Sequence, residues 1–178
     1  MLKKFLGVAT ALALMAPVGV ALAKPAAAAP VLTCAKPSGQ VTFTPGVTQT
    51  PKIQTTTFSL PVKNCKGTKG FTSGTSKGKT VGKTKTGCAN FGDTATQATK
   101  VTITWNNGKT STASLSTKIV PGAPGSLTAS VSGKITAGTA FKGKVIKTKV
   151  TVKLKGTCSA STSIKAAILT GVAPLTIG

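Results

Sequence analysis

Histidine, glutamate, arginine and tyrosine are absent from the 178-residue chain, and aspartate occurs once, as Asp93. Without histidine, a Ser-His-Asp or Cys-His catalytic set cannot be assembled. With one carboxylate side chain, neither the paired carboxylates of a glycosidase nor a carboxylate-rich metal site can form. A Ser-Lys pair or a Schiff-base lysine remains formally available, but no flanking motif singles out any lysine. The inventory therefore predicts a protein that is not an enzyme and that uses no cofactor and no metal.

Aromatic residues are also scarce, at 4% of the chain, and Trp105 is the only tryptophan. Base-specific recognition of nucleic acid commonly uses arginine forks in the groove, and single strands stack on exposed aromatic rings. The chain has no arginine and few rings to expose. Sequence-specific binding of nucleic acid is therefore not expected.

The N-terminal segment has the pattern of an export signal. Two early lysines precede an apolar run over residues 5–20, and Ala-Leu-Ala at 21–23 is a typical cleavage site, so residues 1–23 are predicted to be a signal peptide. An uncleaved membrane anchor is the alternative, but Pro17 and Gly19 interrupt the run.

The mature chain is expected to be one domain that follows a short spacer. Residues 24–30, KPAAAAP, form a low-complexity Ala/Pro spacer that we expect to be flexible, and residues 31–178 form the domain. No transmembrane segment is expected after signal cleavage, because the apolar stretch over 164–177 is short and interrupted. The oligomeric state is left open.

Four cysteines follow the export signal, so disulfides are the expected state. Three pairings are possible, and the sequence alone does not choose among them. We favour Cys34 with Cys65 and Cys88 with Cys158, which close one short and one long loop. A zinc site would need paired short spacings, which are missing here.

Alternation with a period of two indicates β-strands along most of the domain. In residues 141–155, FKGKVIKTKVTVKLK, apolar and lysine positions alternate with one phase change at Val145-Ile146, which predicts a bulged strand or two strands that meet at a corner. Residues 100–120 predict a hairpin that turns at 106–108, with Trp105 in the core.

Turn signals divide the remainder of the domain into short strands. Pro45-Gly46 is expected to stop a strand over 41–43, Pro61 to close a strand over 52–60, and Gly133 to form a turn. The Gly-, Thr- and Lys-rich tract over 64–88 is interpreted as a flexible hairpin or a basic arm, with Phe71 and Val81 as its apolar anchors. Short strands without a credible amphipathic helix predict an all-β antiparallel sandwich of one domain.

Several of these elements also resemble a known group. The stretches VTFTPGVTQTP, FTSGT, ITWNNGKTSTASL and VSGKITAGTAFKGK, with a late cysteine before a Leu-Thr-Ile ending, resemble uncharacterised secreted actinobacterial proteins with an immunoglobulin-like β-sandwich. The resemblance covers most of residues 33–177 and rests on turns and strand patterns. It implies a single, disulfide-stapled immunoglobulin-like β-sandwich and an extracellular location, and it brings no known activity. The chain departs from the group in its lysine load and in Lys142-Gly143-Lys144.

Charge is the remaining chemical feature. All 23 basic residues are lysine, the formal net charge is +22, and loss of two lysines with the signal leaves +20. Such a field attracts polyanions without reading their sequence. The candidate contacts with a polyanion are the lysines of two tracts: Lys77, Lys79, Lys83, Lys85, Lys142, Lys144, Lys147, Lys149, Lys153 and Lys155.

Three hypotheses use this charge differently. In the first, the protein is a secreted, non-enzymatic structural or interaction module, extracellular or loosely associated with the cell wall, that binds anionic wall polymers or other polyanions nonspecifically. In the second, it is a released cationic effector, of an antimicrobial kind, that acts on polyanions or anionic membranes. In the third, the lysines serve solubility and have no partner.

Overall fold

The computed structural model describes residues 29–91, 97–121, 126–159 and 162–178. The predicted signal peptide and most of the spacer therefore lie outside the described residues, as do Asp93 and the Pro-Gly loop at 122–125. The described residues form strands, turns and connecting segments, and no helix occurs among them. The all-β prediction is confirmed.

Ten strands follow one another along the chain. They are β1 (Leu32–Cys34), β2 (Ser38–Val47), β3 (Lys52–Val62), β4 (Lys66–Gly67), β5 (Gly74–Thr86), β6 (Gln97–Trp105), β7 (Thr110–Pro121), β8 (Ser126–Gly138), β9 (Val145–Leu154) and β10 (Ile164–Ile177). All of their pairings are antiparallel.

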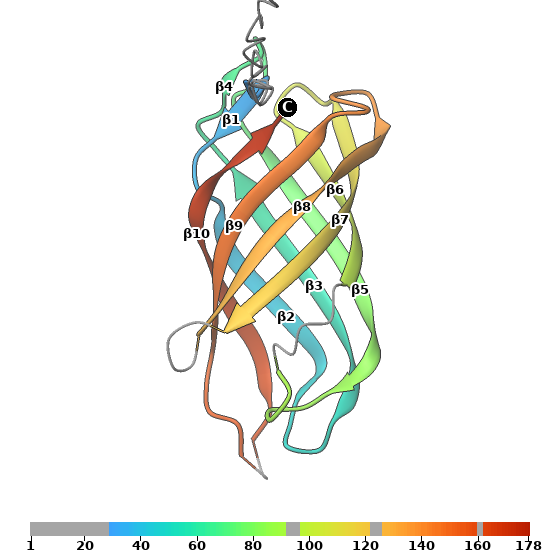
Figure 1. Cartoon of the computed structure of the whole chain (residues 1–178), viewed down its shortest axis with the longest axis vertical. Coiled ribbons are helices and arrows are strands. Elements are labelled where there is room, and N and C mark those ends of the chain that lie inside the picture. The colour runs from blue at the N-terminus through green and yellow to red at the C-terminus, as the bar shows by residue number, and fades with distance from the viewer. Residues whose placement is uncertain (1–28, 92–96, 122–125, 160–161) are drawn as a thin grey trace, which may run out of the picture.

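Eight of the strands close into a barrel. Their order is β2-β3-β5-β6-β7-β8-β9-β10, and β10 returns to pair with β2, for example Ala167 with Val41. The strands run obliquely to the long axis of the molecule, as closure of a sheet requires (Figure 1). The prediction of a two-sheet, immunoglobulin-like sandwich is therefore corrected to a closed barrel, because the last long strand pairs with β2 instead of leaving an open edge.

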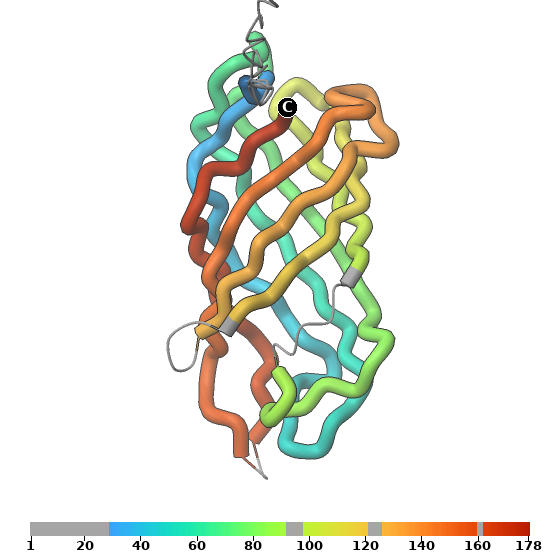
Figure 2. The backbone as a smooth tube through the Cα atoms, viewed as in Figure 1, coloured from blue at the N-terminus to red at the C-terminus, as the bar shows by residue number. Residues whose placement is uncertain are grey.

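The short strands β1 and β4 extend the wall at one end. The first half of β10 pairs with β2, and its second half pairs with β1, with Leu32 opposite Ile177. β4 then pairs with the free side of β1. The described N-terminal residues and the C-terminus consequently lie at the same end of the barrel (Figure 2).

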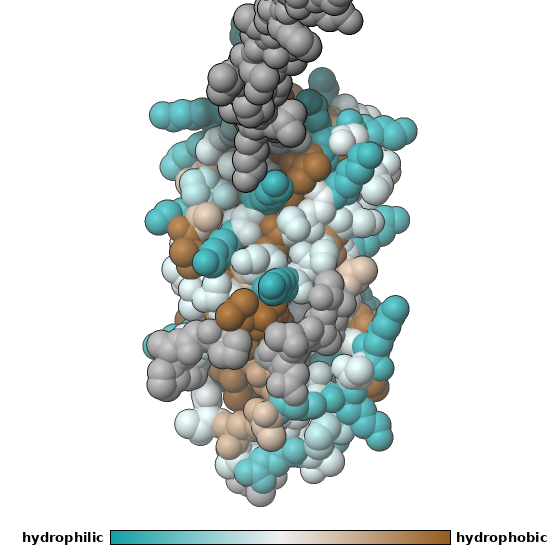
Figure 3. Space-filling view, viewed as in Figure 1, coloured by the Kyte–Doolittle hydropathy of each residue, from teal (hydrophilic) through white to brown (hydrophobic). Residues whose placement is uncertain are grey.

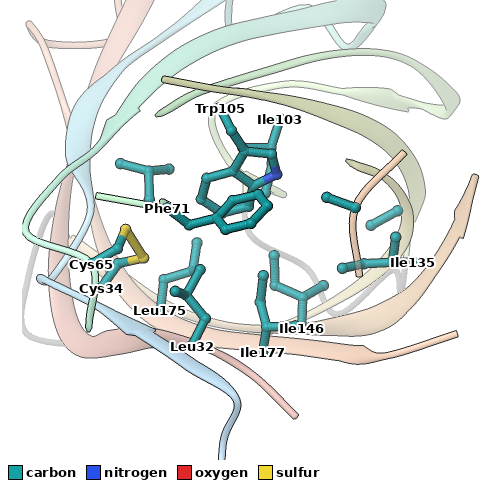
Figure 4. Close-up of a cluster of buried hydrophobic side chains, with 13 residues drawn as sticks. Leu32, Cys34, Cys65, Phe71, Ile103, Trp105, Ile135, Ile146, Leu175 and Ile177 are labelled. Carbon is teal, nitrogen blue, oxygen red and sulfur yellow. A yellow bond between two sulfur atoms is a disulfide. The ribbon is translucent and has the colours of Figure 1, made fainter. Parts of the chain in front are cut away.

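Two hydrophobic clusters occupy the two ends of the interior. The first surrounds Trp105 and includes Phe71, Ile103, Ile135 and Ile177 (Figure 4). The second is built from the following buried residues of β2 and β10: Val41, Phe43, Val47, Ile164 and Ala167.

Each cluster is tied by one disulfide. Cys34–Cys65 joins β1 to the segment after β3 in the first cluster, and Cys88–Cys158 joins the segments after β5 and β9 at the second. The favoured pairing is confirmed. Each bond connects parts of the wall that are distant in sequence, so each holds one end of the barrel closed.

The tryptophan hairpin is also as predicted. Trp105 is 2% exposed, and its Nε1 donates to the Ser111 Oγ (2.9 Å), which in turn donates to the Ala140 carbonyl (2.9 Å). The turn at 106–108 places Gly108 at φ +76°, where glycine is favoured. The core role predicted for Trp105 is confirmed.

Three positions that were expected to end a strand or to form a turn lie inside strands, although β3 ends only one residue after Pro61. Pro45 falls where β2 has passed its last pair with β3, Thr44–Thr55, and where its ladder with β10 is irregular, so the missing N–H breaks no bond. Pro61 lies beyond the part of β3 that pairs with β2. Gly133 is paired with Leu115 in the middle of β8, and a Cβ there would overlap the Ser114 carbonyl oxygen. Proline and glycine therefore do not mark the ends of strands at these positions as predicted.

The two lysine tracts also differ from expectation. Residues 141–144 form the turn between β8 and β9, so the predicted strand begins only at Val145. The tract over 64–88 is mostly the thirteen-residue wall strand β5, and is neither a flexible hairpin nor an arm. Val81 is 58% exposed on the lysine side of β5, so it is not an apolar anchor, whereas Phe71 is buried as expected.

Candidate functional site

Every lysine in the described part of the chain is exposed. The two predicted tracts supply outward rows: Lys77, Lys79, Lys83 and Lys85 on β5, and Lys147, Lys149 and Lys153 on β9. Lys142 and Lys144 lie in the turn before β9, and Lys155 follows its end. The alternation in the sequence predicted that these lysines face solvent, and the structure confirms it.

The structure does not bring the two tracts together. Three strands separate β5 from β9 in one direction around the barrel (β6, β7 and β8), and three in the other (β3, β2 and β10). The two lysine rows consequently lie on opposite sides of the closed wall. A single compact binding site made from both tracts is excluded by the strand order.

Single lysines on the intervening strands connect the two rows. Lys100 on β6, Lys118 on β7 and Lys134 on β8 all point outward, and none of them was among the predicted contacts. They could have been predicted from the sequence, because the alternation in each strand places the lysine on the outer face. We call the outer face of β5 to β9 the lysine wall.

The opposite part of the circumference is poor in lysine. β2 has none, β3 has only Lys52 at its first residue, and β10 has only Lys165. Threonine takes several of the outward positions on β2 and β3, and the Oγ1 atoms of Thr42 and Thr57 lie 2.6 Å apart across these strands. The positive charge is thus spread over the lysine wall and thins out over β10, β2 and β3.

Serine alternates with lysine across the lysine wall. Ser114 of β7 pairs with Lys100 on one side and Lys134 on the other. Ser130 of β8 likewise pairs with Lys118 and Lys149. Because neighbouring strands are about 4.8 Å apart, the lysines of such a row start about 10 Å apart, near the screening length in about 0.1 M salt. The arrangement limits repulsion along the row.

Lysines of two adjacent strands also approach one another at one end of the β5–β6 ladder. Lys79 of β5 and Lys100 of β6 lie just beyond the last pair of their ladder, Gly78–Val101. With Lys77 and Thr102 they line a shallow depression in the outer wall, whose floor includes Phe58. Like charges on neighbouring strands repel one another.

Figure 3 shows one side of this surface. Hydrophilic side chains project all along the visible face, and the apolar areas between them are small and separate. The large exposed hydrophobic residues confirm this dispersal, since they are spread over five strands: Ile53, Val81, Val120, Val145, Ile168 and Val172. No continuous apolar face accompanies the charge in the described part of the chain.

Within the described ranges, no group of three or more His, Cys, Asp or Glu side chains is arranged to hold a metal ion. All four cysteines are in disulfides. Over the same residues, no helix is long and apolar enough to cross a membrane.

Comparison with known proteins gives no further guide to the lysine wall. No protein-family model, no curated protein and no solved structure matches the chain.

Proposed function

We propose that the protein is a secreted, non-enzymatic interaction module of the cell envelope or extracellular space, whose lysine wall binds anionic polymers nonspecifically. The observation that carries the proposal is the uniform outward orientation of the lysines over five adjacent strands. The single acidic side chain, Asp93, lies outside the described residues, so no described side chain neutralises the wall. The two disulfides support an extracellular location.

The chemistry of lysine suits diffuse binding. An ammonium group is a compact, strongly hydrated point charge, whereas guanidinium forms a planar fork that fixes the geometry of its partner. A polymer that carries phosphate, sulfate or carboxylate groups at regular intervals can therefore engage the wall in many registers. Binding of this kind gains free energy mainly from released counterions, and so depends steeply on salt.

The dispersed apolar residues favour this function over a membrane-active effector. A peptide or protein that inserts into an anionic bilayer presents a continuous apolar face beside its charges. The six large exposed hydrophobic residues lie on five different strands. The described surface can therefore adsorb to anionic headgroups, but it has no face with which to enter the acyl layer.

A salt titration tests the proposal. Binding to heparin and to isolated anionic wall polymer is measured by isothermal titration calorimetry over a range of salt concentrations. We expect a linear fall of log K with log salt, with a slope set by the number of anionic groups engaged. A slope near zero, or no binding at low salt, would remove the proposal. Leakage of a dye from anionic vesicles at the same concentrations would favour the effector instead.

Two triple variants with equal loss of charge locate the binding surface. The first variant removes the β9 row of the lysine wall through Lys147→Gln, Lys149→Gln and Lys153→Gln. The matched control removes three lysines outside it, through Lys36→Gln, Lys52→Gln and Lys165→Gln. We expect the first variant to lose more affinity and more of the salt slope than the second. Equal effects would mean that net charge, and not the wall, determines binding.

A further inference from the structure

The interior of the barrel is not completely filled. Between the two hydrophobic clusters lies a cavity of about 310 Å³. Its lining occupies five alternate positions on β3 from Gln54 to Val62, which is about 26 Å of strand at 3.3 Å per residue. The cavity is therefore elongated along the strands. Voids much larger than a water molecule are uncommon in protein interiors, so a space of this size calls for an occupant.

The cavity exists because β5 contributes little volume to the interior. Its inward positions carry Ser76, Gly78, Thr80 and Gly82, while its lysines and Val81 point outward. A Cβ at Gly78 would overlap the ring of Phe58, which crosses from β3 toward β5. An eight-stranded barrel is just wide enough for side chains to fill or for one small ligand to enter. With one strand reduced to small residues, the interior has room for the ligand.

The lining defines the chemistry that fits. Leucine, isoleucine, valine and phenylalanine side chains form most of it, with contributions from β3, β7, β8 and β9. Several of the polar groups already have partners within the protein: the Thr80 Oγ1 donates to the Thr99 Oγ1 (2.8 Å), and the Thr148 Oγ1 donates to the Ala173 carbonyl (3.2 Å). Gln54 is bonded in both directions to the backbone of Gly46.

In the described part of the chain, no charged side chain points into the cavity. Among the described residues, Lys147 is the only charged residue that borders the cavity, and its side chain is exposed on the outer face. A buried ion without a partner is strongly unfavourable. The part of a ligand that enters the cavity is therefore uncharged and needs few hydrogen bonds.

Among the described residues, the β5–β6 ladder ends well before β5 itself does. It runs only from Gly74–Trp105 to Gly78–Val101, whereas β5 stays paired with β3 as far as Thr86. The cavity lining reaches Thr84, Thr86 and Asn90 beyond the end of the shared ladder. Among the described residues, the cavity lining therefore extends past the β5–β6 ladder on the side that carries the outward lysines of β5.

We propose that the barrel binds one aliphatic chain along its interior. An apolar cavity of about 150 Å³ holds one benzene molecule, so by proportion this one accommodates about twelve carbon atoms. The elongated shape favours an unbranched chain over a compact ring system. The chain could belong to a free fatty acid or to a neutral lipid, and the two share the tail that the cavity recognises. This inference does not depend on polymer binding by the lysine wall.

Titration of the full-length mature protein with decanol and with decanoate tests the proposal. Both ligands carry the same tail, and decanol has no charge with which to bind the surface lysines. Binding is followed by calorimetry, and the stoichiometry is checked by native mass spectrometry. We expect saturable one-to-one binding of decanol that is insensitive to salt. Decanoate that binds more tightly, with an advantage that salt removes, would show that a fatty acid also uses surface lysines.

A substitution that fills the cavity tests the binding site, and the same substitution at an adjacent exposed residue is its control. Ala129 is buried, lines the cavity and lies beside the exposed Ser130 on β8. Ala129→Phe should weaken decanol binding by at least about tenfold, one decade in Kd, while Ser130→Phe should leave it unchanged. Thr117→Leu fills the cavity from β7 and serves if Ala129→Phe does not fold. Absence of saturable decanol binding to the wild type, or equal binding to folded filled variants, would overturn the proposal.

Discussion

The hydrogen bonds of Trp105 give a sharp test of how the first cluster is held together. The Ser111 hydroxyl accepts from the indole and donates to the Ala140 carbonyl, and Ser111 is fully buried. Ser111→Ala leaves both partners without that bond in an apolar environment. An unsatisfied buried polar group costs about 1–3 kcal/mol. We expect a loss of about 2 kcal/mol in the free energy of unfolding, or about 4–8 °C in Tm for a chain of this size.

The control is Ser114→Ala, on the exposed side of the same strand. It should change the free energy of unfolding by less than about 0.5 kcal/mol. Unfolding is followed by far-UV circular dichroism in urea, so that Trp105→Phe can be included. In that background Ser111 has lost its donor, and Ser111→Ala should cost less than in the wild type. Equal costs for Ser111→Ala and Ser114→Ala, or strict additivity with Trp105→Phe, would refute the argument.

Two further predictions concern the backbone of the barrel. Replacing Cys88 and Cys158 together with serine opens a link over 70 residues and should lower the free energy of unfolding by about 4 kcal/mol, measured by urea titration. Gly133→Ala should be severely destabilising, by about 3 kcal/mol or more, because its Cβ meets the backbone of β7. Gly143→Ala, at φ +84° with no atom within 4 Å, should cost only about 1–2 kcal/mol. A Gly133→Ala protein as stable as Gly143→Ala would contradict the close approach.

Local elements could be predicted because their determinants are close in sequence. The hairpin around Trp105 combines alternation with a turn of three consecutive residues, and both strands form as expected. The inward row Ile146, Thr148, Val150 and Val152 on β9 was likewise readable from its period of two. In each case one strand or one turn contains the whole signal.

Closure of the barrel could not be predicted in this way. A sandwich and a barrel need the same alternation in every strand and differ in whether the last strand pairs with the first long one. Here that pairing joins β10 to β2, more than 100 residues apart in sequence, such as Ala167 with Val41. Neither strand records its partner in its own pattern.

The orientation of the lysines could be predicted from the sequence, whereas their arrangement around the barrel could not. The outward orientation of Lys77, Lys79, Lys147 and Lys149 follows from the strand period, but their separation around the barrel depends on strand order. The cavity could also have been predicted, from the residues between the lysines of β5. These residues are small, and a strand with an inward row of serine, glycine and threonine cannot fill a core.

Because lysine is distributed unevenly, one side of the barrel carries more positive charge than the other. A particle charged equally on all sides meets an anionic layer in any orientation, whereas this one has a charged flank and, on β2, a strand without a single lysine. Near such a layer, the electrostatic torque would turn the barrel until β7, the middle strand of the lysine wall, faces the layer, with the β5 and β9 rows on either side of it. The threonines of β2 and β3 would then face away from the layer, so that adsorbed molecules would present an exterior that is poor in lysine and rich in hydroxyl groups.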